Sequence, residues 1–482
     1  MENKKIKIVS IISVIALALT LVAATYAYFV AQTGEGAQTD IKINANTVDT
    51  FTFEAGSALT LNLTQQNFAS GKGNQTGTTF AKAMLTANNK TNTATEHYYL
   101  YLNISNNTFT YSIDNNTPEI LLSIKDGSNN EITTLTGLTY KTVTDGKGTT
   151  LKGFDITKKS GLVTILNNRE ITTTSTKTEE WNVTVTFVNY NSNQAGNAGK
   201  NFSAKLMIQK EKIPTVLSDV CTSGNNLSTC ITTLSNKSEP SIVNIYHHTS
   251  SLANGAGDNS YRYAGASDSV NNYICLGSNE ATCPDANLFR IIGVFGDQTK
   301  VIRAKSVENK AWHSLNSNTW STSSLNTYLN GEYLTSLGTL ANKIATTTWK
   351  VGGGSSTNLY DVPKTAYQYE VGSSASATTN DAKIGLMYVS DYGYAADQSA
   401  WTTKLSSYNS NTSKNWLYLG SDEWTISRYS GTTFSAFYVS STGGVDSDTV
   451  TLSCAVRPSF NLESSVNYVS GSGSMSDPVR VN

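Results

Sequence analysis

The chain has 482 residues, which is too long for a single ordinary core, so two or three domains are expected. Only 15% of the residues are charged, against an average of about 25%, and about 170 Asn, Ser and Thr residues take their place. The net charge of -1, without runs of like charge, argues against a nucleic-acid binder, and 38% hydrophobic residues argue against intrinsic disorder.

The amino terminus has the pattern of an export signal. Three lysines within the first seven residues precede an uncharged, apolar stretch of twenty-four residues, 8–31. Basic residues before such a stretch hold the N-terminus in the cytoplasm, so the bulk of the chain is expected outside the cell. A hydrophobic helix of this length can span a bilayer. We therefore predict that residues 1–31 are either a signal peptide, cleaved by a signal peptidase after Ala27, or a membrane anchor.

The end of this segment carries a more specific pattern. The letters TYAYF at residues 25–29 and DIKIN at residues 40–44 resemble the precursors of the camelysin/TasA-like family of Gram-positive bacteria. The resemblance is close over the first fifty residues and loose over residues 40–213. It implies an exported protein that is found at the cell surface or in the fibres of a biofilm matrix.

Residues 32–213 alternate apolar and polar side chains in short segments separated by turn residues. Such alternation predicts half-buried strands, and several of them with spaced turns predict an antiparallel β-sandwich. Near its end, the odd-numbered side chains from Trp181 to Phe187 are expected to face the core, and the even-numbered ones from Asn182 to Thr186 to face outward. Self-association of this domain requires only an exposed strand edge that accepts a neighbour's strand.

Residues 214–260 are predicted to be a linker with a short helix and a local disulfide. Ser, Asn, Gly and Ala dominate the stretch from Thr249 to Gly257, as in flexible connections. His247 and His248 precede this stretch, and a flexible pair of histidines makes a poor metal site.

The cysteines agree with export. Cys221 and Cys230 flank one short polar interval, and Cys275 and Cys283 flank another, which suits two local disulfides formed outside the cell. Neither interval has the two-to-four-residue spacing of zinc knuckles, so no metal is predicted there. Cys454 lies in an apolar segment and is interpreted as a small buried residue; a nucleophile would need a neighbouring base.

Residues 261–482 are predicted to form an α+β domain. Residues 287–295 and 300–304 have the pattern of a β-hairpin, and Leu, Tyr and Ile recur at helical spacing between Ser324 and Ile344, with Gly331 expected to split that region into two short helices. Further strands follow, which together with the helices indicate an α+β fold. Six of the seven tryptophans lie in this domain, between residues 312 and 424.

Several motifs of this domain resemble a domain family of unknown function that is common in surface proteins of gut Gram-positive bacteria. They are LFRIIGVF at 288–295, SLNTYLNGE at 324–332, DEWTISR at 422–428, RPSFNL at 457–462 and GSGS at 471–474. That family is distantly similar to the C-type-lectin and formylglycine-generating-enzyme fold, which implies a C-type-lectin-like domain. The sequence lacks the Glu-Pro-Asn and Trp-Asn-Asp motifs of calcium-dependent lectins and the paired redox cysteines of the enzymes, so no activity, metal or cofactor follows from the fold.

Three aromatic residues are candidates for a ligand platform. Trp416, Tyr418 and Trp424 could stack on sugar rings, because aromatic side chains offer both an apolar face and a hydrogen-bonding group. Core packing is the alternative, since Trp424 and Ile426 share one face of a predicted strand.

Two further groups of residues are candidates for binding. Arg428, like Arg457, stands among apolar residues and either binds an anion or pairs with a nearby carboxylate, for which Asp422, Glu423 and Asp446 are available. The second group has the polar surroundings of a surface loop near Asn316 and Asn318; it comprises Trp312, His313 and Trp320.

Three functions are compatible with the sequence. The first is an exported cell-surface protein that acts in adhesion, with a glycan or a host surface protein as ligand. The second is a structural subunit of an extracellular matrix or fibre. The third is a secreted hydrolase: no motif of the Gly-x-Ser-x-Gly or His-Glu-x-x-His type occurs, but a carboxylate pair needs no local motif.

Overall fold

The computed structural model describes residues 49–68, 72–88 and 92–482. The predicted leader, its hydrophobic helix and the cleavage site at Ala27 lie outside the described residues. Among the residues that are described, no helix combines the length and the apolar character needed to cross a bilayer. The protein is mainly β, with 38% strand and 19% helix, and divides into two compact units, residues 1–212 and 213–482.

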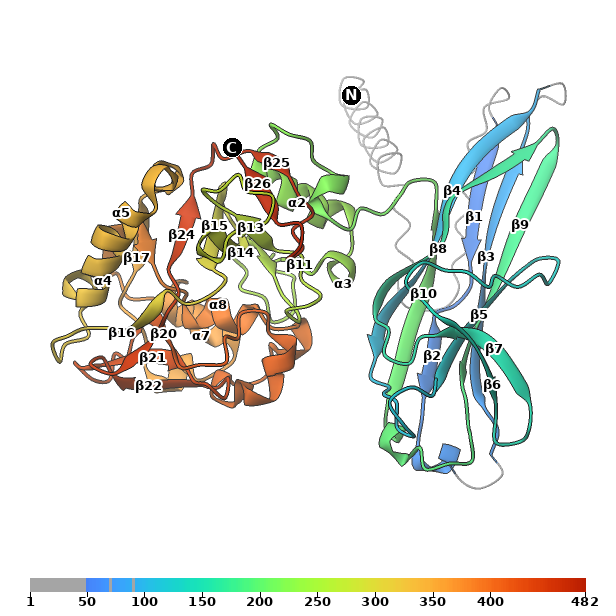
Figure 1. The fold of residues 1–482 in the computed structure, drawn as a ribbon, viewed down its shortest axis with the longest axis horizontal. Helices are drawn as coiled ribbons and strands as arrows, with labels where there is room; N and C mark the ends of the chain where they lie inside the picture. Colours follow the sequence, from blue (N-terminus) through green and yellow to red (C-terminus); the bar gives the residue numbers. More distant parts are fainter. Residues whose placement is uncertain (1–48, 69–71, 89–91) are drawn as a thin grey trace, which may run out of the picture. The chain divides into compact units, whose positions relative to one another are not determined.

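Unit 1 contains a six-stranded and a four-stranded sheet, and all neighbouring strands are antiparallel. The long strands β3, β4 and β9 run along the length of this unit (Figure 1). The six-stranded sheet has the order β1 (Thr50–Ala55), β3 (Gln75–Thr86), β9 (Thr176–Phe187), β5 (Ile120–Asp126), β7 (Thr150–Asp155), β6 (Tyr140–Thr144). The four-stranded sheet has the order β2 (Leu59–Asn62), β10 (Asn201–Gln209), β4 (Ala94–Asn107), β8 (Gly161–Thr173).

One apolar core lies between these two sheets, which makes unit 1 an antiparallel β-sandwich. Alternate residues of β9, from Trp181 to Phe187, are buried in this core together with side chains of both sheets, whereas Asn182 is exposed. The predicted alternation of β9 is therefore confirmed. The indole N–H of Trp181 donates to the hydroxyl of Tyr98 at 2.8 Å, so the polar atom of this large core side chain is satisfied.

The segment 214–260, predicted to be a linker, is instead part of unit 2. The short helix is α2 (Leu227–Lys237), and its apolar face carries Leu227, Ile231 and Leu234 into the core of that unit. After α3 (Pro240–Val243), strand β11 (Ile245–His247) pairs with β12 (Tyr261–Tyr263). The Ser-, Gly- and Ala-rich stretch is a structured loop between these two strands. In this loop the backbone N–H of Ala256 donates to Nδ1 of the buried His248 at 3.0 Å.

Unit 2 combines a nine-stranded sheet, a five-stranded sheet and a short two-stranded one. Most of their strands are antiparallel, and the parallel pairs are β13 with β26 and β20 with β23. The nine-stranded sheet comprises β19 (Ile384–Gly385), β24 (Ser459–Leu462), β15 (Gln298–Arg303), β14 (Leu288–Phe295), β13 (Tyr273–Cys275), β26 (Val479–Val481) and β25 (Tyr468–Ser470), with β12 and β11 attached to β14. The others comprise β16 (Glu308–Ala311), β23 (Ser453–Val456), β20 (Glu423–Arg428), β21 (Ser435–Val439) and β22 (Val445–Thr449), and then β17 (Thr347–Lys350) with β18 (Thr379–Ala382).

Short helices connect these strands and complete an α+β unit. The predicted hairpin is β14 and β15, which turn at Gly296 with a φ of 63°, a left-handed conformation that glycine adopts without strain. Gly331 does not split the helical region, because a π-helical turn, η6 (Leu329–Tyr333), joins the helices on either side. The α-helices of this part are α4 (Ser324–Tyr328), α5 (Leu334–Ser336), α6 (Ser356–Leu359), α7 (Pro363–Glu370) and α8 (Val389–Tyr394).

Both predicted disulfides are present. Cys221 is bonded to Cys230, and Cys275 is bonded to Cys283, each with a Cα–Cα distance of 5.8 Å. Cys454 is free and buried on β23, as predicted for a small core residue, and burial raises the pKa of its thiol to about 12. Two disulfides are typical of a protein that folds in an oxidising environment.

Candidate functional site

The tryptophans proposed as binding residues lie in the core of unit 2. Trp312, Trp320, Trp416 and Trp424 are each at most 2% exposed. Three of the four indole N–H groups donate to backbone carbonyl oxygens, for example that of Trp416 to Tyr263 at 2.8 Å. These side chains are therefore core residues, which corrects the predicted binding role and agrees with the alternative of core packing.

The other predicted site residues also form hydrogen bonds within the protein. His313 is 5% exposed, and its Nδ1 accepts the backbone N–H of Ser324 at 3.2 Å. Tyr418 is half-buried, and its hydroxyl donates to the carbonyl of Ser441 at 2.5 Å. Arg428 donates through Nε to the carbonyl of Gly352 at 3.0 Å. The structure therefore does not gather the predicted residues into one exposed site.

Of the two arginines predicted to pair with carboxylates, only Arg457 does so in the described residues. Its guanidinium binds Glu423 in a two-pronged contact, with Nε–Oε1 at 2.6 Å, and both side chains are at most 2% exposed. Burial raises the pKa of the Glu423 carboxyl, and the neighbouring Arg457 opposes this rise. This buried ion pair belongs to the core of unit 2.

A second buried ionic cluster lies below the nine-stranded sheet of unit 2. Asp391 contacts Lys300 at 2.5 Å and Arg262 at 3.5 Å, and Arg262 also contacts Asp258 at 2.6 Å. Burial lowers the pKa of Lys300, and Asp391 opposes this shift. Because each of these charges is paired inside the fold, the cluster offers no free group to a ligand.

The loop between Trp312 and Trp320 does reach the surface, but through an aliphatic residue. Leu315 is 67% exposed, and the two neighbouring segments expose Phe434 (38%) and Leu452 (44%). We refer to these three side chains as the Leu315 surface. A signal was present in the sequence, since Leu315 is the one apolar residue in the otherwise polar run 313–318.

Backbone hydrogen bonds bring the three segments of the Leu315 surface together. The N–H of His313 donates to the carbonyl of Val450, and the N–H of Val450 donates to the carbonyl of Phe434. The side-chain amide of Asn318 is buried and donates to three carbonyls, those of Tyr429, Thr432 and Ser435, at 2.8–3.0 Å. The loop that carries Leu315 is therefore held in one conformation.

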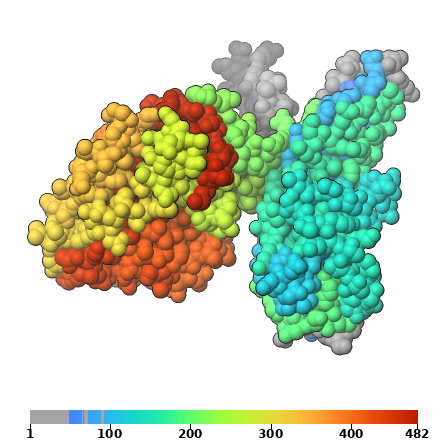
Figure 2. All heavy atoms as spheres, viewed as in Figure 1, coloured from blue at the N-terminus to red at the C-terminus, as the bar shows by residue number. Residues whose placement is uncertain are grey.

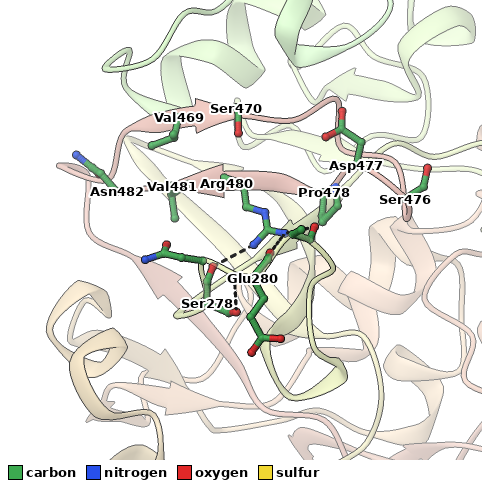
Figure 3. A pocket seen from close by; sticks show the side chains of 12 residues that line it. Ser278, Glu280, Val469, Ser470, Ser476, Asp477, Pro478, Arg480, Val481 and Asn482 are labelled. Carbon is green, nitrogen blue, oxygen red and sulfur yellow. Dashed lines mark hydrogen bonds between the residues drawn. The ribbon is translucent and has the colours of Figure 1, made fainter.

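A separate polar pocket of about 450 Å³ lies beside the C-terminal strands β25 and β26 (Figure 3). The loop closed by the Cys275–Cys283 disulfide forms its other side. Arg480 projects from β26 toward this loop and donates to the carbonyls of Ser278, Glu280 and Ala281 at 2.8–3.1 Å. The guanidinium therefore fastens the loop to the C-terminal strands and is not free to bind an anion.

Metal binding has no visible basis in the part of the chain from residue 49 onward that is described. No group of three or more His, Cys, Asp or Glu side chains is arranged there to hold an ion. His248 is fully buried, and burial lowers its pKa to about 2, so it is a neutral core residue rather than part of a flexible pair.

These features define a disulfide-bonded protein of two units, a β-sandwich and an α+β unit, with a fixed apolar surface on the second. Residues 296–464 match the family model of a domain of unknown function, DUF6273. The matched region contains all three residues of the Leu315 surface. No curated protein matches the chain.

Proposed function

We propose that this chain is an exported cell-surface binding protein of a Gram-positive bacterium, and that unit 2 contacts a host surface protein through the Leu315 surface. The two disulfides support a location outside the cell. The N-terminal resemblance to camelysin/TasA-like precursors supports export and a surface location. A C-type-lectin-like fold for unit 2 is part of this proposal.

The exposure of Leu315, Phe434 and Leu452 is the observation that carries the proposal. Exposed apolar side chains on segments that backbone hydrogen bonds hold together are typical of protein-binding surfaces. The amide of Asn318 holds the loop before any partner arrives, so binding does not have to order it. Leu315 and Leu452 offer no hydrogen-bonding group, so contact through them favours an apolar part of a protein over a hydroxyl-rich glycan.

The test is a binding assay of the purified full chain on immobilised mucin, fibronectin and collagen. The variant Leu315→Ser/Phe434→Ser is expected to weaken binding to the recognised protein by at least about tenfold, since central apolar contacts each contribute roughly 1–2 kcal/mol. Met475→Ser is the matched control, because Met475 is 63% exposed and lies on the turn between β25 and β26.

Three results contradict the proposal. Binding that is unchanged in Leu315→Ser/Phe434→Ser, or lost to the same degree in Met475→Ser, excludes the Leu315 surface as the contact site. Thermal unfolding of each variant, followed by tryptophan fluorescence, separates loss of contact from loss of fold. No binding to any of the three proteins argues against the host-protein role.

A structural subunit of an extracellular matrix is the second candidate, and one feature of unit 1 favours it. Strand β8 has thirteen residues and, among the described strands, pairs only with β4, so its other edge has no partner strand in that part of the chain. Two register shifts interrupt the pairing with β4, one at Asn167 and Asn168, where Asn168 has a φ of 54°, and one at Ile165, and they leave residues 161–164 as a regular part. A neighbour's strand could add to that part.

The matrix role is tested by light scattering of the full chain at increasing concentration. Thr164→Lys places a charge on the regular part of the β8 edge and is expected to reduce assembly, because an edge lysine opposes strand addition. Thr178→Lys, on the exposed face of β9, is the control. Equal assembly of both variants excludes the β8 edge, and a chain that stays monomeric excludes the role.

A further inference from the structure

The outer face of the six-stranded sheet in unit 1 carries a groove of about 550 Å³. Strand β5 forms its floor with Ser123 and Lys125, β9 forms one wall with Thr184, and β7 forms the other with Lys152. In Figure 2 the residues of these strands are among the teal and green atoms of unit 1. The volume falls within the roughly 300–1,000 Å³ of small-molecule sites.

The groove lies where strand β7 stops pairing with β5 after two residue pairs. The two strands pair only at Leu121 with Asp155 and at Leu122 with Phe154. Gly153 allows this close approach, since a Cβ there would lie 2.8 Å from the carbonyl oxygen of Leu122. Beyond that point β7 pairs with β6 as a hairpin, and the groove is lined by residues of β5, β7 and β9.

Several polar side chains that line this groove have no partner among the described residues. Neither ammonium group, that of Lys125 or that of Lys152, has an ion pair or hydrogen bond among the residues that the structure describes. The same holds for the side chains of Asn182 and Thr184 in the described part of unit 1. The one carboxylate of the groove, Glu131, accepts the hydroxyl of Ser123 at 3.0 Å.

This arrangement differs from the pocket beside the C-terminal strands. In that pocket the Arg480 guanidinium donates to backbone carbonyls of the same protein. Two lysines and one carboxylate that is already hydrogen-bonded are among the lining residues of the groove of unit 1, so the net charge of this lining is positive. A ligand with negative groups is therefore the complementary one.

The lining also selects the body of the ligand. Leu151 is half-buried and gives the groove an apolar side chain, while hydroxyl and amide side chains line much of the rest. A sugar ring offers a C–H face for the first and hydroxyls for the second. We infer that this groove is a binding site for an acidic oligosaccharide, with Lys125 and Lys152 paired to its negative groups. The site lies on unit 1 and does not depend on the Leu315 surface.

Calorimetric titration of the full chain with three probes tests this inference. Trigalacturonic acid carries both sugar rings and carboxylates, maltotriose carries rings alone, and tripolyphosphate carries charge alone. Trigalacturonic acid is expected to bind with a Kd in the millimolar range or tighter, and the other two at least about tenfold more weakly. Lys125→Gln/Lys152→Gln is expected to weaken trigalacturonic acid binding by at least about tenfold.

The control for charge is Lys237→Gln/Lys404→Gln, which removes two exposed lysines of unit 2 and leaves the groove intact. Its affinity for trigalacturonic acid is expected to match that of the unaltered chain. The inference is overturned if trigalacturonic acid does not bind, if both double variants lose binding equally, or if tripolyphosphate binds as tightly. Circular dichroism of the two variants establishes that each is folded.

Discussion

Replacement of Arg457 with methionine tests how much the stability of unit 2 depends on the buried Arg457–Glu423 ion pair. The Arg457 guanidinium and the Glu423 carboxylate are at most 2% exposed, and Nη2 also donates to the carbonyl of Leu417 at 2.5 Å. Methionine has a similar length but no charge, so the variant leaves the Glu423 carboxylate buried without its partner. Burial of an unpaired charge is one of the few single changes with a large cost.

The expected magnitude follows from the burial of this pair. Removal of one partner of a buried ion pair costs about 3–5 kcal/mol. Unit 2 has 270 residues (482 − 212), and about 1 kcal/mol shifts the Tm of a domain near this size by roughly 2–4 °C. Arg457→Met is therefore expected to lower the Tm of unit 2 by roughly 6–20 °C at pH 7.

The loss of stability in Arg457→Met also depends on pH, and the raised pKa of Glu423 sets the direction of this dependence. Burial raises the pKa of Glu423 above its ordinary 4.5, and without Arg457 the pKa rises further. A carboxyl with a raised pKa in the folded state contributes stability at low pH, and this contribution is lost as the pH rises. The deficit of Arg457→Met relative to the unaltered chain is thus smallest near pH 4.5 and grows by up to about 1.4 kcal/mol per pH unit.

Urea unfolding of the full chain between pH 4.5 and 8, followed by tryptophan fluorescence, measures this deficit. Six of the seven tryptophans lie in unit 2, so the signal reports mainly on that unit. The double variant Glu423→Gln/Arg457→Met has no carboxyl at this position, so the pH dependence that Glu423 adds in Arg457→Met is expected to be absent from its free energy of unfolding. A deficit in Arg457→Met that is constant across this range, or absent at pH 7, refutes the reasoning.

Three further predictions concern unit 2. Burial lowers the pKa of His248 from 6.5 to about 2, so between these pH values only the unfolded chain takes up a proton at this residue. The urea concentration at the midpoint of unfolding is therefore expected to fall as the pH drops below 6.5. In His248→Asn it is expected to fall less steeply. Cys275→Ser/Cys283→Ser is expected to reduce the free energy of unfolding by about 2–3 kcal/mol in calorimetry, since the unfolded chain loses a constraint. Because the pKa of Cys454 is raised to about 12, mass spectrometry is expected to find it alkylated by iodoacetamide at pH 8 only after unfolding.

Local patterns predicted the strands and the disulfides well. The alternation between Trp181 and Phe187 is set by the two faces of a single strand, and the structure places the odd-numbered side chains in the core. The β14–β15 hairpin is likewise encoded between its own ends, at Gly296. The short polar intervals between the cysteines made local pairing the natural outcome. Each of these features depends on residues close together in the chain.

The candidate site could not be predicted in this way, because exposure is decided by distant segments. Trp312 and Leu315 are three residues apart, yet the first is fully buried and the second is 67% exposed. The difference arises because the Trp312 indole donates to the carbonyl of Thr425, more than one hundred residues away. The segment 214–260 was misjudged for the same reason, since its short helix α2 is covered by strands that come later in the sequence.

The low content of charge has a structural explanation that the composition alone does not give. All six non-glycine residues with positive φ in the described part of the chain are asparagines, a residue that tolerates this conformation. Buried asparagines such as Asn318, Asn272 and Asn415 donate their side-chain amides to backbone carbonyls of neighbouring segments. An amide satisfies these carbonyls without the desolvation cost of an ammonium or guanidinium group. Asparagine thus fixes loop segments of this protein without adding charge.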